Sequence, residues 1–175
     1  MGVNTEKLVE VAFSLINSLS MCEQQIERTN VFIKNVEDEI KKIQEDEKLP
    51  GMIKAMQINA CRAQIEKVES SRKNLISSRD EMDSHYSEMV DVIKENGLEE
   101  ELIAALTGTK IMISDEIESL SEQIELLSVS DDNKKKSDTE LNLRLSKVAC
   151  NVFETAIESL KGIVIEQSPS GFGGK

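Results

Sequence analysis

The only histidine of this 175-residue chain, His85, is the first candidate for acid–base chemistry. Asp83 and Glu88 lie close to it in the sequence, and a carboxylate near an imidazole is an arrangement that general bases use. However, His85 falls beside an apolar stripe of a predicted helix and not within it. We therefore expect a solvated side chain and assign His85 no catalytic role.

The three cysteines, Cys22, Cys61 and Cys150, are the next candidates, for metal binding or disulfide formation. Each lies in an apolar periodic stretch far from the others, and together with one histidine they show none of the spacings of a zinc site. An odd number of cysteines also cannot pair completely. We expect buried free thiols in a reducing compartment.

Two segments resemble ligand-binding loops only superficially. Residues 106–110, Leu-Thr-Gly-Thr-Lys, lack the paired glycines and the Lys-Ser/Thr order of a phosphate-binding loop. Asp131 and Asp132 lie in a polar run without the central glycine and final glutamate of an EF-hand. The sequence therefore predicts a protein that is not an enzyme and has neither a cofactor nor a bound metal.

Composition favours a helical protein with few rings in its core. There are four Phe, one Tyr, no Trp and two Pro, and 33 acidic residues against 21 basic ones give a net charge of −12. Such a chain repels phosphate backbones, which argues against nucleic acid as a partner. Residues 1–97 carry a net charge of −5 and residues 98–175 carry −7, so we expect the acidity to be spread over the chain.

No stretch approaches the roughly 18–20 apolar residues of a membrane span, and the N-terminus lacks a basic segment followed by an apolar one. We expect no membrane-spanning segment. The chain is predicted to be cytoplasmic as synthesised, and leaderless export is compatible with the same features.

The elements that must position these residues follow from a heptad pattern. Apolar residues recur in alternating steps of four and three over residues 8–43, and a second stripe of the same kind covers residues 58–93. Sustained alternation of this kind is typical of coiled coils. The expected interaction seam contains Leu8, Leu15, Leu19, Ile26, Ile33, Ile40, Ile65, Val68, Leu75, Met82 and Met89.

The fold class predicted from these stripes is all-α: a long antiparallel coiled-coil hairpin over residues 1–97, followed by shorter helices that pack as a bundle. We expect the two helices of the hairpin at about 5–48 and 52–95, with a turn at Pro50-Gly51 because proline interrupts the helical hydrogen bonds and glycine permits the reversal.

Two layers of the expected hairpin contain polar residues. Antiparallel pairing around the turn joins positions whose numbers sum to 101, which places Thr29 with Arg72 and Cys22 with Arg79. Polar layers fix the register of a coiled coil and lower its stability. The two arginines could form a buried anion or partner site. The interpretation we favour is that their stems cover the seam and their guanidinium groups reach nearby acids.

Residues 98–165 are predicted to form shorter helices at about 98–107, 110–128 and 138–165. Thr107-Gly108-Thr109 separates the first two, and Ser-Asp-Thr-Glu at 137–140 is a capping-box pattern that begins the third. Residues 166–175 are expected to be a flexible tail, in which Phe172 is either a docking residue or simply part of a disordered segment. The main apolar face of the last helix contains Leu141, Leu145, Val148, Val152, Phe153 and Leu160.

These features predict a non-catalytic protein that acts through protein–protein contacts. Apolar surface outside the seam, which another helix should cover, is added by Ile16, Ile53, Ile76 and Val90. That helix belongs either to the same chain, closing a bundle, or to another copy, giving a homo-oligomer or filament. The alternative function is a cytosolic adaptor or chaperone that holds a helical client segment in a groove.

In its long hairpin, aromatic-poor composition and terminal amphipathic helix, the chain resembles the leaderless, acidic, tryptophan-free helical proteins exported by bacterial secretion systems. The type III needle-tip, sheath-filament and translocon components are the relevant examples. The resemblance implies a self-assembling structural component that leaves the cell.

Overall fold

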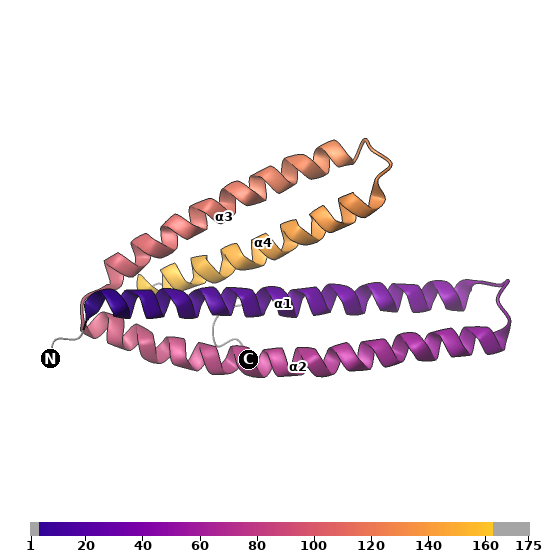
Figure 1. Cartoon of the computed structure of the whole chain (residues 1–175), viewed down its shortest axis with the longest axis horizontal. Helices are drawn as coiled ribbons and strands as arrows, with labels where there is room; N and C mark the ends of the chain where they lie inside the picture. Colours follow the sequence, from indigo (N-terminus) through magenta and orange to yellow (C-terminus); the bar gives the residue numbers. More distant parts are fainter. Residues whose placement is uncertain (1–3, 163–175) are drawn as a thin grey trace. The chain divides into compact units, whose positions relative to one another are not determined.

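The computed structural model describes residues 4–162, and they form four α-helices and no strand. The helices are α1 (Thr5–Glu45), α2 (Gly51–Glu95), α3 (Glu99–Leu127) and α4 (Asn133–Leu160) (Figure 1). The predicted all-α class is confirmed.

The connection between α1 and α2 differs from the expected turn. The Asp46 carboxylate accepts a hydrogen bond from the backbone N–H of Lys48 at 2.9 Å, which favours a turn and ends α1 at Glu45 rather than at residue 48. The Pro50 carbonyl accepts from the N–H of Lys54 at 3.0 Å, so α2 begins at Gly51. Gly51 is therefore the first helical residue, and residues 46–50 make the reversal.

The end of α2 follows the predicted Asn96-Gly97 signal. Gly97 adopts the left-handed conformation with φ of 66°, and the N–H of Leu98 donates to the Ile93 carbonyl at 3.1 Å. This is the hydrogen bond of a Schellman motif, in which glycine supplies a backbone conformation that other residues adopt at a cost.

Two expected boundaries in the second half of the chain are wrong. α3 is continuous from Glu99 to Leu127, so the predicted break at Thr107-Gly108-Thr109 does not occur. A glycine inside a helix costs only about 1 kcal/mol, which the burial of Leu102 and Leu106 on the same helix outweighs. α4 begins at Asn133 rather than near residue 138, because the Asp132 side chain accepts from the N–H of Lys135 and caps the helix.

The chain divides into two compact units, and the division falls within α1 and α2 rather than after residue 97. Unit 1 comprises Met1–Gln24 and Arg79–Lys175, and unit 2 comprises Gln25–Ser78. The end of the last predicted helix, the flexible tail and Phe172 lie outside the described residues.

Unit 1 is a helical bundle built from the start of α1, the end of α2, and α3 and α4. Among residues 4–162 its core contains the largest fully buried side chain, Phe153, whose ring lies 6.2 Å from that of Phe13 at an angle of 55°. α4 therefore packs against α1 and α2 of its own chain. The core contains Ala12, Ile16, Leu19, Tyr86, Val90, Ile93, Leu98, Leu102, Leu106, Val152, Phe153, Ala156, Ile157 and Leu160.

Unit 2 consists of the second half of α1 and the first part of α2, which run antiparallel and side by side (Figure 1). Its covered positions recur in steps of three and four. On α1 they include Val36, Ile40 and Ile43. On α2 they include Cys61 and Ile65, while the residues between them are exposed. One stripe of each helix is thus covered.

Candidate interaction site

The expected seam residues are covered and not exposed. Leu19 and Ile26 are buried, and the other nine are half-buried: Leu8, Leu15, Ile33, Ile40, Ile65, Val68, Leu75, Met82 and Met89. The nine half-buried residues keep only part of their apolar surface free for a partner. On α4, Leu145, Val152, Phe153 and Leu160 are buried and Leu141 and Val148 are half-buried.

The polar layer at the boundary of unit 1 contains an ion pair that the sequence did not identify. The Arg79 guanidinium lies 3.5 Å from the Glu23 carboxylate and 2.9 Å from that of Asp80. Glu23 directly follows Cys22, the residue expected to share a layer with Arg79. An acidic residue next to a layer that contains an arginine is the sequence signal from which this ion pair could be predicted. Arg79 thus reaches nearby acids, as the favoured interpretation expects of both arginines, whereas no ion pair joins Arg72 to an acid within residues 4–162.

Burial sets the electrostatics of this layer. Desolvation raises the pKa of the Glu23 carboxyl, although Arg79 opposes the effect. Desolvation also raises the pKa of the Cys22 thiol, and Glu23 adds to this while Arg79 lowers it. The Cys22 thiol is thus held in its protonated, weakly nucleophilic form.

The other polar layer lies in unit 2. The Thr29 hydroxyl donates to the Ile26 carbonyl at 2.6 Å, within its own helix. Arg72 is half-buried, and its buried Nε has no hydrogen-bond partner among residues 4–162.

The three cysteines are free thiols, with Cys22 and Cys61 buried and Cys150 half-buried. Within the described part of the chain, no cluster of three or more His, Cys, Asp or Glu side chains is placed to hold a metal ion. No helix of residues 4–162 is both long and apolar enough to cross a membrane.

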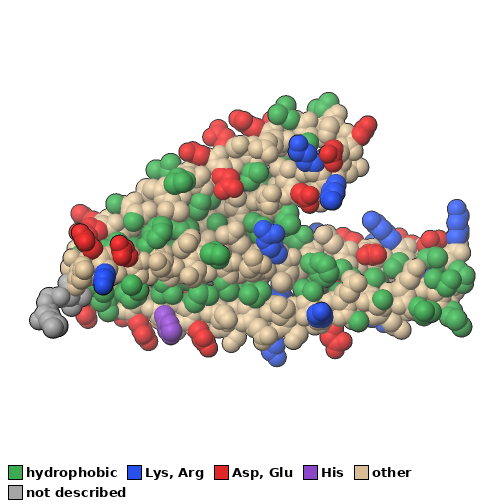
Figure 2. All heavy atoms as spheres, viewed as in Figure 1, with side chains coloured by type: hydrophobic (Ala, Val, Ile, Leu, Met, Phe, Trp, Pro, Cys, Tyr) green, Lys and Arg blue, Asp and Glu red, His purple; other side chains and the backbone are tan. Residues whose placement is uncertain are grey.

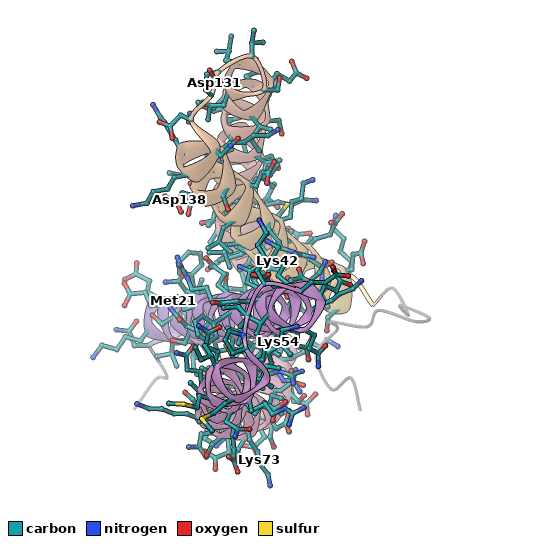
Figure 3. All side chains as sticks on the ribbon, turned by 90° about the vertical axis from the view of Figure 1, so that its right-hand side faces the viewer. Met21, Lys42, Lys54, Lys73, Asp131 and Asp138 are labelled. Atoms are coloured by element: carbon teal, nitrogen blue, oxygen red, sulfur yellow. The ribbon has the colours of Figure 1, made fainter. Side chains whose placement is uncertain are left out.

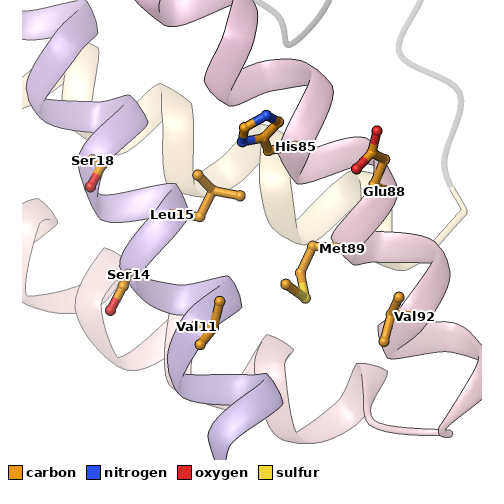
Figure 4. Close-up of a pocket in the computed structure, with 8 residues that line it drawn as sticks. All are labelled: Val11, Ser14, Leu15, Ser18, His85, Glu88, Met89 and Val92. Atoms are coloured by element: carbon orange, nitrogen blue, oxygen red, sulfur yellow. The ribbon is translucent and has the colours of Figure 1, made fainter.

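Unit 1 contains a groove of ≈ 580 Å³ between α1 and α2. Leu15 and Met89 point into it from the two helices, and His85 and Glu88 lie on the α2 wall (Figure 4). The lining residues are Val11, Ser14, Leu15, Ser18, His85, Glu88, Met89 and Val92. His85 is exposed, as predicted, and Figure 2 shows it below a band of hydrophobic side chains with acidic groups to either side.

The heptad pattern of the sequence does not predict this groove. Its shape depends on the small side chains of Ser14 and Ser18, which lie one helical turn apart beside Leu15. A pair of serines at this spacing on an otherwise apolar edge is the available signal. A second hollow of ≈ 420 Å³, which includes Phe13 and Ala105, shares Ser14 with the groove.

An exposed apolar cluster lies at the start of α2 in unit 2. Met52, Ile53 and Met56 are 79%, 42% and 67% exposed and fall within the first two turns of the helix. We call these three residues the tip cluster. Beside it, Lys54 extends toward α1, where its Nζ donates to the Gln44 carbonyl at 3.1 Å (Figure 3).

Charge is divided between the units and not spread over the chain as expected. Unit 2 contains ten basic and nine acidic residues, a net charge of +1, which leaves −13 for unit 1. The two parts of α2 show the same division: residues 51–78 carry +3 and residues 79–95 carry −4. The net charge of residues 1–97 is a sum over both segments, so it does not show that their charges have opposite signs.

Comparisons with protein-family models, with curated proteins and with solved structures found no match to the chain.

Proposed function

We propose that this chain is a non-catalytic helical protein that acts through protein–protein contacts and assembles with other copies of itself. The main support for the proposal is the tip cluster. Covering its three large apolar side chains with a protein surface lowers the free energy, because it removes apolar surface from water. The groove of unit 1 is a second apolar surface suited to such contacts.

Mass in solution tests this proposal. Light scattering of the full chain should show a mass that rises with concentration above the 19.5 kDa of one chain. A constant mass of one chain from about 1 to 100 μM, where an interface of modest quality should associate, would exclude self-assembly.

We further propose that the two helices of unit 2 form an antiparallel coiled coil. The spacing of their covered positions, in steps of three and four, supports this proposal. Cysteines introduced at Ile33 and Val68, in a chain whose native cysteines are replaced by serine, should crosslink rapidly under oxidant. Cysteines at Ile33 and Ser71 are the matched control, because Ser71 is exposed. Equal crosslinking of both pairs would contradict the register.

An adaptor or chaperone that holds a helical client is the second candidate, favoured by the open groove with its acidic wall residue Glu88. A client would co-purify with the chain from its native cell and be displaced by charge reversal in the groove. Export as a filament or needle-tip component is the form of self-assembly that the sequence resemblance implies, and detection of the chain outside its native cell tests it.

A further inference from the structure

The tip cluster presents a pattern that helix-binding grooves recognise. Met52 lies four residues before Met56, and Ile53 lies three residues before it. Because residues three and four apart are neighbours on a helix surface, the three side chains share one face of α2. Ala60 and Ala63 are also exposed and continue along the helix with small side chains. Small residues next to large anchors allow a second surface to approach the helix closely.

The groove of unit 1 has matching properties. Its floor is formed by Leu15 and Met89, and its edges by the partly exposed Val11 and Val92. The serines of the α1 wall leave room for inserted side chains. Its volume of ≈ 580 Å³ lies within the range of about 300–1,000 Å³ typical of ligand-binding sites, so it can receive several side chains.

Charge complementarity identifies a second copy of the chain as the occupant. The part of α2 that contains the tip cluster, residues 51–78, carries five basic and two acidic residues, of which Lys54 lies between Ile53 and Met56. The α2 wall of the groove belongs to residues 79–95, with six acidic and two basic residues, and three glutamates follow at 99–101. The turn at residues 46–50 carries two acidic residues, Asp46 and Glu47, and one basic residue, Lys48, so the favourable contact is made by α2 and not by the turn.

We propose that the first turns of α2 in one copy, with Met52, Ile53 and Met56, dock in the groove of unit 1 in the next copy. This inference rests on the self-assembly proposed above and specifies its interface. The two contact surfaces differ, so the interface is heterologous, and repetition gives a closed ring or an open filament. Each copy contains one tip cluster and one groove, so each has one surface of each kind to offer.

Two variants and their mixture test the pairing. Met52→Gln with Met56→Gln removes the apolar anchors of the tip, and Val11→Lys places a cation at the groove edge. All three positions are exposed, and far-ultraviolet circular dichroism checks that helix content is kept. Each variant alone should lose at least about tenfold in association constant, the effect of removing a well-packed interface side chain. Met112→Gln, at a 71% exposed methionine of α3, is the matched control and should assemble like the wild type.

Mixing the tip variant with the groove variant is the decisive measurement. The tip variant keeps an intact groove and the groove variant keeps an intact tip, so the mixture should form a dimer of twice the 19.5 kDa chain mass and nothing larger. If neither variant alters assembly, or if their mixture stays monomeric, the pairing is wrong although self-assembly stands. If the wild type itself is monomeric at every concentration, the proposed function fails as well. Should Val11→Lys reduce helix content, Val92→Lys on the opposite edge replaces it.

Discussion

Tyr86 allows the core of unit 1 to be tested at a single atom. The side chain is 2% exposed, and its hydroxyl donates to the Ala156 carbonyl at 3.5 Å and is hydrogen-bonded with Ser159. Desolvation raises the pKa of the phenol well above its ordinary value of 10.0. The Ser159 hydrogen bond opposes this shift, and Asp83 adds to it.

The sign of the pH dependence follows from this raised pKa. Below pH 10 the phenol is protonated in both states, and its contribution to stability is fully present. Above pH 10 the unfolded chain releases the proton while the folded chain keeps it, so the free energy of unfolding falls as pH rises. One retained proton corresponds to a slope of about 1.4 kcal/mol per pH unit.

The comparison of wild type with Tyr86→Phe isolates this slope, because the lysines that also titrate at high pH contribute equally to both. At neutral pH we expect the variant to be less stable by about 0.5–1.5 kcal/mol, the value of a lost buried hydrogen bond. Above pH 10 the wild type should lose this advantage at the slope given above. Urea unfolding followed by circular dichroism, at several pH values, measures both.

A direct optical titration provides the refutation. Tyr86 is the only tyrosine and the chain has no tryptophan, so near-ultraviolet phenolate absorbance reports this one residue. We expect the absorbance to appear only together with loss of helix. A midpoint at the ordinary value of 10.0 with helix content unchanged would show that the hydroxyl is open to solvent and is not buried in the core.

Three further predictions concern packing, backbone conformation and charge. Phe153→Ala should lower the free energy of unfolding by about 3–5 kcal/mol, whereas Phe32→Ala, at a 42% exposed ring of unit 2, should lower it by less than about 1 kcal/mol; equal effects in urea unfolding would contradict the assigned core. Gly108→Ala should stabilise α3 by about 0.5–1 kcal/mol because a Cβ there meets no other atom, while Gly97→Ala should cost about 1–2 kcal/mol because its φ is 66°. The raised pKa of Glu23 means that its contribution to stability is present below pH 4.5 and is lost as pH rises through the pKa of the folded state. The stability of Glu23→Gln relative to the wild type should therefore increase as pH rises from acid to neutral. If urea unfolding shows that this relative stability increases as pH falls, the pKa of Glu23 is lowered and not raised.

The helical class and the covered stripes were predictable because they depend on local periodicity. The four-three spacing identified positions that the structure covers, such as Leu19 and Ile26, and Asn96-Gly97 identified the end of α2. The continuity of α3 across Gly108 was not predictable from the local sequence, because it depends on packing against α4. Local signals overestimated the effect of a glycine that costs only about 1 kcal/mol.

The candidate site was less accessible to sequence reasoning than the fold. The groove requires two helices and the short side chains of Ser14 and Ser18, and the spacing of these serines on α1 indicates only one of its two walls. The charge division appears only when residues are counted by compact unit, because each unit combines segments far apart in the sequence. Sequence patterns therefore located the covered positions, while the surfaces open to partners emerged from tertiary packing.

The regular stripe of unit 2 also limits how its length can vary. Deleting one heptad from α1 and one from α2 would shorten the pair by about 10 Å and leave every remaining side chain on its original face. Deleting a single residue would rotate all later positions of that helix by about 100° and bring polar side chains to the covered face. The helices of unit 2 can therefore change in length only in matched steps of seven residues. A variant with one heptad removed from each helix should fold and keep the tip cluster on the same face of α2.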